Sequence, residues 1–264
     1  SPERIAPVCP HFGTCGGCVA QHMGPQLYAD WKRGIVMEAF RQHGLQAEIE
    51  PLRRIAPGTR RRAVLTARHE AGATTLGYHR RKSSALVDIQ ECPILVPAIV
   101  DSLPALRAIA MAMAGRETRL TVLHTPAGLD VSVDCGARAI GPGTQLALGR
   151  IASAHRLARL AVDGETLIER AAPALSFGGI DVVPPAGAFV QAAEAAEREI
   201  TRLVVDAAGR SKRVADLFCG VGTFTLPVAR TGRVLAVDGD RAALSALDAA
   251  ARRGQGLKPI ETRL

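Results

Sequence analysis

Short runs of alternating hydrophobic and polar residues dominate the first half of the chain, and this period of two is typical of β-strands. Three such runs follow one another closely, at residues 63–68, 76–79 and 86–89. A further pair, at residues 120–124 and 129–134, is separated by a short Pro- and Gly-containing turn and predicts a hairpin. The pattern therefore predicts an antiparallel sheet in this part of the chain.

Helical periods lie on both sides of these runs. Residues 25–44 place their apolar positions on one side of a helix that has Pro in its first turn and Gly at its end. Residues 97–114 are helical in pattern despite an internal proline, and residues 145–160 favour helix, with strand as the alternative for part of the stretch. Residues 176–183 form a further strand candidate, and residues 191–208 predict a helix that ends at a glycine.

The pattern changes near residue 212. A short strand of the buried type at residues 214–218 is followed by a Gly-rich turn and a helix, then by a second strand at residues 234–237 and a helix at residues 242–253. A third strand can begin at Ile260. Strands that alternate with helices in this way indicate the opening of a parallel α/β sheet.

Together these patterns predict a protein of the α/β class in two parts: an α+β central domain with an antiparallel sheet at residues 1–186, and the first part of a Rossmann-like domain at residues 187–264. Hydrophobic residues make up 47% of the 264 residues and charged residues 22%, so the chain can bury a sizeable core. No apolar run is long enough for a membrane span, and no secretory signal opens the chain. We expect a cytoplasmic monomer.

Positive charge is concentrated in one stretch. Residues 53–82 hold nine Lys and Arg and the single acid Glu70. The net charge of this stretch is therefore +8, equal to that of the whole chain. Such a density indicates a polyanionic partner, most often a nucleic acid, although an Arg-rich solvated face is the alternative. The predicted RNA contacts are Arg60, Arg61, Arg62, Arg80, Arg81 and Lys82.

Cysteines form the first chemical motif. Cys9, Cys15 and Cys18 have the spacing C-x5-C-x2-C, and Cys92 begins a Cys-Pro turn after a predicted strand. A tight triplet with one remote cysteine is more typical of a 4Fe–4S cluster than of zinc, which more often uses two C-x2-C pairs. Zinc, and unligated or disulfide-bonded thiols, remain alternatives. His11 and His22 could replace a ligand, but we expect both to be ordinary loop histidines.

A glycine turn after the strand at residues 214–218 forms the second motif. Gly220 and Gly222 would let a ligand approach the backbone, but Thr225 stands where a dinucleotide fingerprint has its third glycine. Asp238, sixteen residues after Gly222, can accept hydrogen bonds from ribose hydroxyls. The combination favours S-adenosylmethionine (SAM) over NAD. An ordinary strand-to-helix turn is the alternative, and we expect Cys219 in this turn to be a small buried residue.

The chain resembles the bacterial RNA 5-methyluridine methyltransferases that carry an iron–sulfur cluster. Four pieces carry the resemblance: the cysteine triplet, Cys-Pro-Ile-Leu at residues 92–95, Gly-Ala-Phe-Val-Gln at residues 187–191, and the glycine turn at residues 216–227. The resemblance implies a cluster-bearing domain that holds RNA and a SAM-binding methyltransferase domain. It places the cofactor contacts at Gln191, Phe218, Gly220, Gly222, Thr223 and Asp238, with Thr223 and Asp238 where the family more often has Asn and Glu.

The resemblance also implies SAM-dependent methylation of C5 of a uridine in structured RNA, either tRNA or rRNA. The family uses a Cys nucleophile and a Glu base downstream of the glycine turn, and no matching segment occurs before Leu264. We therefore assign no catalytic residue, and we expect the chain to be incomplete and inactive by itself. The alternative is a non-catalytic, cluster- or zinc-stabilised RNA-binding module. A radical-SAM enzyme is excluded because its first cysteine gap is three residues, whereas this gap is five.

Overall fold

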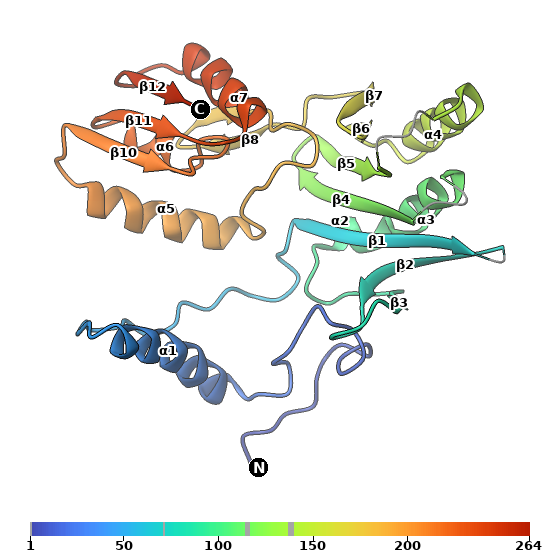
Figure 1. Ribbon diagram of the computed structural model, residues 1–264, viewed down its shortest axis with the longest axis horizontal. Helices are drawn as coiled ribbons and strands as arrows, with labels where there is room; N and C mark the ends of the chain where they lie inside the picture. Colours follow the sequence, from blue (N-terminus) through green and yellow to red (C-terminus); the bar gives the residue numbers. More distant parts are fainter. Residues whose placement is uncertain (1, 71, 114–116, 137–139) are drawn as a thin grey trace.

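The computed structural model describes residues 2–70, 72–113, 117–136 and 140–264. Figure 1 shows a central sheet between an N-terminal segment, which carries the cysteine loop and helix α1, and a smaller parallel sheet at the C-terminal end of the chain. The division into an antiparallel part and a parallel part follows the sequence pattern.

The central sheet has seven strands within the described residues, in the order β3-β2-β1-β4-β5-β6-β7. Its strands are β1 (Arg62–Glu70), β2 (Ala73–His79), β3 (Leu86–Asp88), β4 (Glu117–Thr125), β5 (Gly128–Asp134), β6 (Arg159–Val162) and β7 (Glu165–Glu169). Neighbouring strands are antiparallel, as predicted, except for β5 and β6, which run parallel. The parallel pair arises because helix α4 (Pro142–Ala154) connects β5 to β6. The strand alternative for the end of residues 145–160 is therefore correct.

Three helices cover one face of this sheet. Helices α3 (Leu103–Ala112) and α4 pack against each other and against the strands, and α2 (Pro97–Asp101) precedes them. The predicted single helix at residues 97–114 is broken at Ser102, because Pro104 lies in the first turn of α3, where its missing N–H costs nothing. Residue 114 lies outside the described residues. The core between helices and strands consists of fully buried aliphatic side chains such as Leu65, Leu106 and Leu120.

The C-terminal part has three parallel strands in the described residues, β10 (Arg213–Leu217), β11 (Arg233–Val237) and β12 (Ile260–Arg263), as the sequence predicts. Its helices are α5 (Glu194–Ala208), α6 (Thr225–Val228) and α7 (Arg241–Arg253). The strand predicted at residues 176–183 is instead the hairpin of β8 (Leu175–Phe177) and β9 (Ile180–Val182), because two glycines with positive φ reverse the chain between them. This hairpin packs on α7.

Two buried arginines hold the central sheet to the segment that leads into the parallel sheet. The Arg61 guanidinium lies 2.8 Å from Glu197 of α5, and both side chains are at most 10% exposed. The Arg159 guanidinium pairs with Asp130 at 2.6 Å and also donates to the Pro184 carbonyl oxygen at 2.8 Å. Burial raises the pKa of Glu197, whereas the Arg61 charge opposes the rise. Each ion pair is desolvated, so removal of either partner leaves an uncompensated buried charge.

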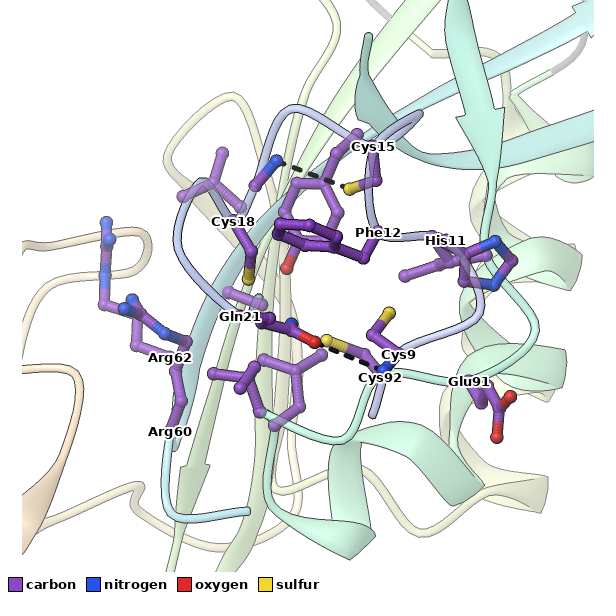
Figure 2. Close-up of a pocket in the computed structure, with 17 residues that line it drawn as sticks. Cys9, His11, Phe12, Cys15, Cys18, Gln21, Arg60, Arg62, Glu91 and Cys92 are labelled. Atoms are coloured by element: carbon purple, nitrogen blue, oxygen red, sulfur yellow. Dashed lines mark hydrogen bonds between the residues drawn. The ribbon is translucent and has the colours of Figure 1, made fainter. Parts of the chain in front are cut away.

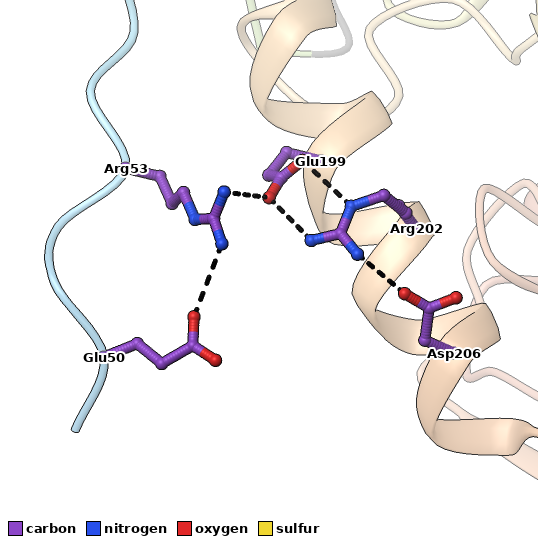
Figure 3. A network of polar contacts seen from close by, with 5 residues as sticks. All are labelled: Glu50, Arg53, Glu199, Arg202 and Asp206. Atoms are coloured by element: carbon purple, nitrogen blue, oxygen red, sulfur yellow. Dashed lines mark hydrogen bonds and ion pairs between the residues drawn. The ribbon is translucent and has the colours of Figure 1, made fainter. Parts of the chain in front are cut away.

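Exposed ion pairs tie the linker before β1 to helix α5 as well. Figure 3 shows Arg53 between Glu50 and Glu199, with Arg202 bonded to Glu199 and to Asp206 one turn further along the helix. These side chains are largely solvated, so the network contributes little to stability. It does neutralise Arg53, which belongs to the basic stretch of the sequence.

Helix α1 (Pro25–Gln42) begins and ends where the sequence predicts, with Pro in its first turn. It has no buried residue, and Figure 1 shows it apart from both sheets. Its apolar side chains Trp31, Ile35 and Met37 are 38–51% exposed. Within the described residues, no helix is both long and apolar enough to cross a bilayer.

Replacement of Glu197 by Ala is expected to lower the free energy of unfolding by about 3 kcal/mol, because it leaves the Arg61 charge buried without a partner. Urea unfolding followed by circular dichroism measures the change. Glu194→Ala, on the same helix but exposed and paired only with Arg198, is the matched control and is expected to have almost no effect. Equal effects of the two variants would contradict the role of the buried pair.

Candidate functional site

The cysteine loop is attached to the turn between β2 and β3. The Gly16 N–H donates to the His79 carbonyl oxygen at 2.9 Å, and Cys15 forms an isolated β-bridge with Arg80. A Cβ atom on Gly16 would lie 2.7 Å from that same oxygen, so only glycine allows this approach. The loop therefore lies against the start of a turn that carries Arg80, Arg81 and Lys82.

All four predicted ligands line one cavity of about 290 Å³. Figure 2 shows Cys18 and Cys15 on one side of it and Cys9 and Cys92 on the other. Cys92 is 74 residues from Cys18 in the sequence, and the fold brings it to the cavity because β3 ends beside the cysteine loop. Apolar side chains of Phe12, Tyr78 and Leu95 complete the wall.

Two thiols of this cavity, those of Cys9 and Cys15, ionise less readily than a free cysteine. Burial raises the pKa of the Cys9 thiol, and the nearby Cys92, Cys18 and Cys15 raise it further, whereas a hydrogen bond from the His11 backbone lowers it. Burial likewise raises the pKa of Cys15, against a hydrogen bond from the Gly17 N–H. Burial also raises the pKa of the Tyr78 hydroxyl, and Cys92 adds to the rise. A bound cationic centre would compensate these penalties.

The donor set can be compared with the two metal centres considered from the sequence. Among the described residues, no three His, Cys, Asp or Glu side chains form a group that could hold a metal ion in their present positions. A single zinc ion needs its thiolates about 2.3 Å away. Here the four thiols surround an open cavity instead, an arrangement that suits a larger inorganic group held by four cysteines.

The two loop histidines differ in position. His11 lines the cavity, whereas His22 lies outside its lining and has its ring 5.6 Å from that of Phe12. His11 Nε2 and His22 Nδ1 are buried without a hydrogen-bond partner in the described structure.

The glycine turn forms at the carboxyl end of β10. Phe218 adopts a positive φ of 61° and is 89% exposed, and Gly220 and Gly222 also have positive φ. A Cβ atom on Gly222 would lie 2.5 Å from a methyl group of Leu247, so this glycine lets the turn pack against α7. Thr223 follows with an intermediate exposure.

Two aspartates hold the glycine turn in place. Asp238, directly after β11, accepts hydrogen bonds from the Gly220 N–H at 2.7 Å and the Asp240 N–H at 2.8 Å. Asp216 accepts a hydrogen bond from the Thr225 hydroxyl at 2.6 Å. Burial raises the pKa of Asp216, the Thr225 hydrogen bond lowers it, and the nearby Asp238 raises it. Thr225, which is buried, thus donates to the half-buried Asp216 carboxylate, and comparing Thr225 with the third glycine of a dinucleotide fingerprint does not reveal this role.

The remaining cysteines are poorly suited to nucleophilic attack. Cys219 is 5% exposed, and burial together with Asp216 and Asp238 raises its pKa to about 12. At neutral pH it is a thiol, in agreement with the small buried residue predicted. The Cys135 thiol, just after β5, donates to an Asp163 carboxylate oxygen at 3.0 Å.

Gln191 lies in the segment that joins the two sheets, between the buried Val190 and the start of α5. The central sheet holds this segment through two arginines. The Arg61 N–H donates to the Ala192 carbonyl oxygen at 2.7 Å, and Arg62 Nε donates to the Ala188 carbonyl oxygen at 3.2 Å. The Arg62 guanidinium also lies 5.5 Å from the centre of the exposed Phe189 ring.

The basic residues separate into two groups. Arg60, Arg80, Arg81 and Lys82 are exposed, and Arg60 also lines the cysteine cavity. The prediction that Arg61 contacts RNA is wrong, because its side chain is buried and paired with Glu197. Arg62 is half-buried, and its guanidinium is engaged with residues 187–189. Burial, with the adjacent Arg60 charge, lowers the pKa of Arg62.

Comparisons with known proteins agree on one kind of enzyme. No family profile matches the chain. An uncharacterized RNA methyltransferase of Rhizobium meliloti is 46% identical over 98% of this chain and 64% of its own length. The 23S rRNA (uracil(1939)-C(5))-methyltransferase RlmD of Alkalilimnicola ehrlichii is 32% identical over 92% of this chain and 58% of its own length.

The chain is similar in sequence to proteins named as RNA methyltransferases. It spans 58–64% of the length of these two relatives. Its fold matches the Pyrococcus abyssi tRNA (uracil-54, C5)-methyltransferase, solved with S-adenosyl-L-homocysteine, with a TM-score of 0.73 over 100% of this chain and 66% of that one, at 17% identity. The α/β fold predicted from the sequence is therefore that of a SAM-dependent methyltransferase.

Proposed function

We propose that this chain binds SAM at the glycine turn and belongs to a protein that methylates C5 of a uridine in structured RNA. The observation that carries the proposal is the presence of two built sites in one chain: four cysteines around one cavity, and a glycine turn held by Asp238. The names of the relatives support this substrate class, because one is a 23S rRNA uracil-C5 methyltransferase and the structural neighbour acts on uracil-54 of tRNA.

SAM fits the glycine turn better than a dinucleotide does. The side chains that we expect to contact it are Gln191, Phe218, Thr223 and Asp238, with Gly220 and Gly222 letting it approach the backbone. Each Asp238 oxygen accepts one backbone N–H and keeps a lone pair that can accept from a ribose hydroxyl. The half-buried Asp216 beside the turn would repel a pyrophosphate, whereas the nucleoside and sulfonium of SAM carry no phosphate charge.

We assign a 4Fe–4S cluster to the cavity of Cys9, Cys15, Cys18 and Cys92, with zinc as the less favoured occupant. The iron ions would supply the positive charge that lets four neighbouring thiols ionise. The chain's own contribution is to fix the cysteine loop against the β2–β3 turn, through Gly16 and Cys15. The cluster would thus stabilise the surface that presents Arg80, Arg81 and Lys82.

The same exposed residues, with Arg60, are the proposed RNA contacts. Phosphate binding needs accessible cations, and none of these four has an ion-pair partner within the described part of the chain. A uridine in structured RNA must leave its stack before C5 can be reached.

Methylation at C5 of uracil requires a thiolate that attacks C6 and a base that removes the C5 proton. Four of the six cysteines line the cavity, Cys219 is a buried neutral thiol and Cys135 is bonded to Asp163. We therefore propose that residues 1–264 bind SAM and RNA without forming 5-methyluridine. A non-catalytic RNA-binding module is the competing function.

SAM binding separates these two functions. Isothermal titration calorimetry of the 264-residue chain is expected to show binding, and Asp238→Ala is expected to weaken it at least tenfold, or about 1.4 kcal/mol. The matched control is Asp181→Ala, an exposed carboxylate on β9 that should leave the affinity unchanged. A folded chain that does not bind SAM would favour the non-catalytic module, and 5-methyluridine formed by this chain would contradict the expected inactivity.

Chain purified without oxygen is expected to contain four iron and four sulfide ions and to absorb broadly in the visible region. Cys92→Ser should abolish the absorbance, because it removes one of the four ligands. Cys135→Ser, whose thiol lies outside the cavity, should retain it. One zinc ion per chain, in the absence of iron, would show that the site is a zinc site instead.

The RNA surface is tested by the triple variant Arg80→Ala, Arg81→Ala, Lys82→Ala. We expect the variant to bind RNA more weakly. The slope of the logarithm of the binding constant against the logarithm of the salt concentration should become shallower by about 0.7–0.9 for each phosphate that the variant no longer neutralises. The control variant replaces Arg210, Lys212 and Arg213 by Ala. These residues are exposed at the amino end of β10, whereas the glycine turn lies at its carboxyl end. Filter binding over a range of KCl concentrations measures both, and an equal weakening in the two variants would refute the assignment of the β2–β3 turn.

A further inference from the structure

Gln21, three residues after Cys18, places a half-paired side-chain amide beside the cysteine cavity. Its Oε1 accepts a hydrogen bond from the Cys9 backbone N–H at 3.2 Å. Its Nε2 is buried and has no hydrogen-bond partner among the described residues. Figure 2 shows the amide between Cys18 on one side and Cys9 and Cys92 on the other, and Gln21 is one of the residues that line the cavity.

The Cys9 N–H fixes which end of the amide faces the cavity. A backbone N–H can only donate, so the atom opposite it must be the oxygen of the Gln21 side chain. The NH₂ group then has to lie on the other side, away from Cys9 N. A buried NH₂ group without an acceptor is costly, and such groups in folded proteins call for an explanation.

Among the residues that the structure describes, none accepts a hydrogen bond from this NH₂ group, but the polar groups around the cavity suggest its role. The Gly17 N–H already donates to the Cys15 Sγ atom at 3.4 Å, so the cysteine loop directs N–H groups at sulfur. His11 Nε2 is also buried and unpaired, but its ring lies beyond Cys9 in Figure 2, away from the space between the thiols. Gln21 is thus the side-chain donor best placed to meet the occupant of the cavity.

We infer that Gln21 is a positioning residue that donates a hydrogen bond from Nε2 to a sulfur atom of the 4Fe–4S cluster, either a bridging sulfide or a cysteine thiolate. The inference rests on the proposed cluster and goes beyond it by naming a side chain that tunes the centre. A hydrogen bond to sulfur stabilises the more negative, reduced state, and hydrogen bonds of this kind are one determinant of cluster potentials. The bond raises the reduction potential, and its Oε1 contact holds the Cys9 backbone in place.

Two variants remove the donor in different ways. Gln21→Met keeps a side chain of similar length without an N–H, and Gln21→Glu keeps the oxygen that accepts from Cys9 N–H. Gln26→Met is the matched control, because Gln26 is exposed on α1 and donates only to Asp30. The anaerobically purified chains are titrated with redox mediators, and the midpoint potential is followed by visible absorbance. Pulsed electron paramagnetic resonance of the reduced clusters, in H₂O and in D₂O, detects exchangeable protons close to sulfur.

We expect Gln21→Met and Gln21→Glu each to disfavour the reduced cluster at least tenfold, a negative shift of about 59 mV for a one-electron couple. Both should lose one exchangeable-proton coupling that the parent chain and Gln26→Met retain. If the parent chain carries a cluster and both variants have the same potential and proton couplings as the parent, this inference is overturned and the cluster assignment stands. A parent chain that carries no cluster overturns both.

Discussion

The two sites meet at three consecutive residues, Arg60 to Arg62, and the rest of the structure depends on this meeting point. Arg60 forms a backbone bridge with Leu95, three residues after Cys92, and another with Ala193, two residues after Gln191. Arg61 then places its charge against Glu197 inside the protein. A stretch that looks like a nucleic-acid footprint in the sequence is in part the joint between the sheet that carries the cysteines and the segment that leads to the glycine turn.

Electrostatics gives the two sites opposite requirements. The cysteine cavity gathers four thiols, and burial raises the pKa of two of them, Cys9 and Cys15, so it favours a positive occupant. The glycine turn lies beside two half-buried aspartates, Asp216 and Asp238, so it disfavours an anionic occupant. A cationic inorganic centre and a sulfonium nucleoside satisfy these two requirements, and the relatives of the chain are methyltransferases that act on RNA.

Local patterns predict most of the fold because each element carries its own signal. The strands of the β1–β2–β3 and β4–β5 meanders, helix α1, and the parallel β10–β11–β12 sheet all lie where periodicity and glycine positions place them. What could not be read from the chain depends on partners far away in sequence. In the sequence, Arg61 cannot be distinguished from the neighbouring arginines, but in the structure it is buried in an ion pair with Glu197, 136 residues later. The role of Thr225 depends on its contact with Asp216, nine residues earlier, and the unpaired NH₂ group of Gln21 is apparent only in the folded cavity.

The two carboxylate oxygens of Asp238 accept hydrogen bonds from different backbone N–H groups, one from Gly220 and the other from Asp240. Both bonds lie beside the proposed nucleoside site. Asp240 also caps helix α7 through the N–H groups of Ala242 and Ala243, so hydrogen bonds link the glycine turn, Asp238 and the start of the helix. These hydrogen bonds form without a ligand, so the glycine turn is preorganised. For the proposed SAM site, binding of the ribose would then require little ordering of the protein. The exchange of the methylated cofactor for its demethylated product would depend on the hydrogen bonds to the ligand rather than on the folding of a loop.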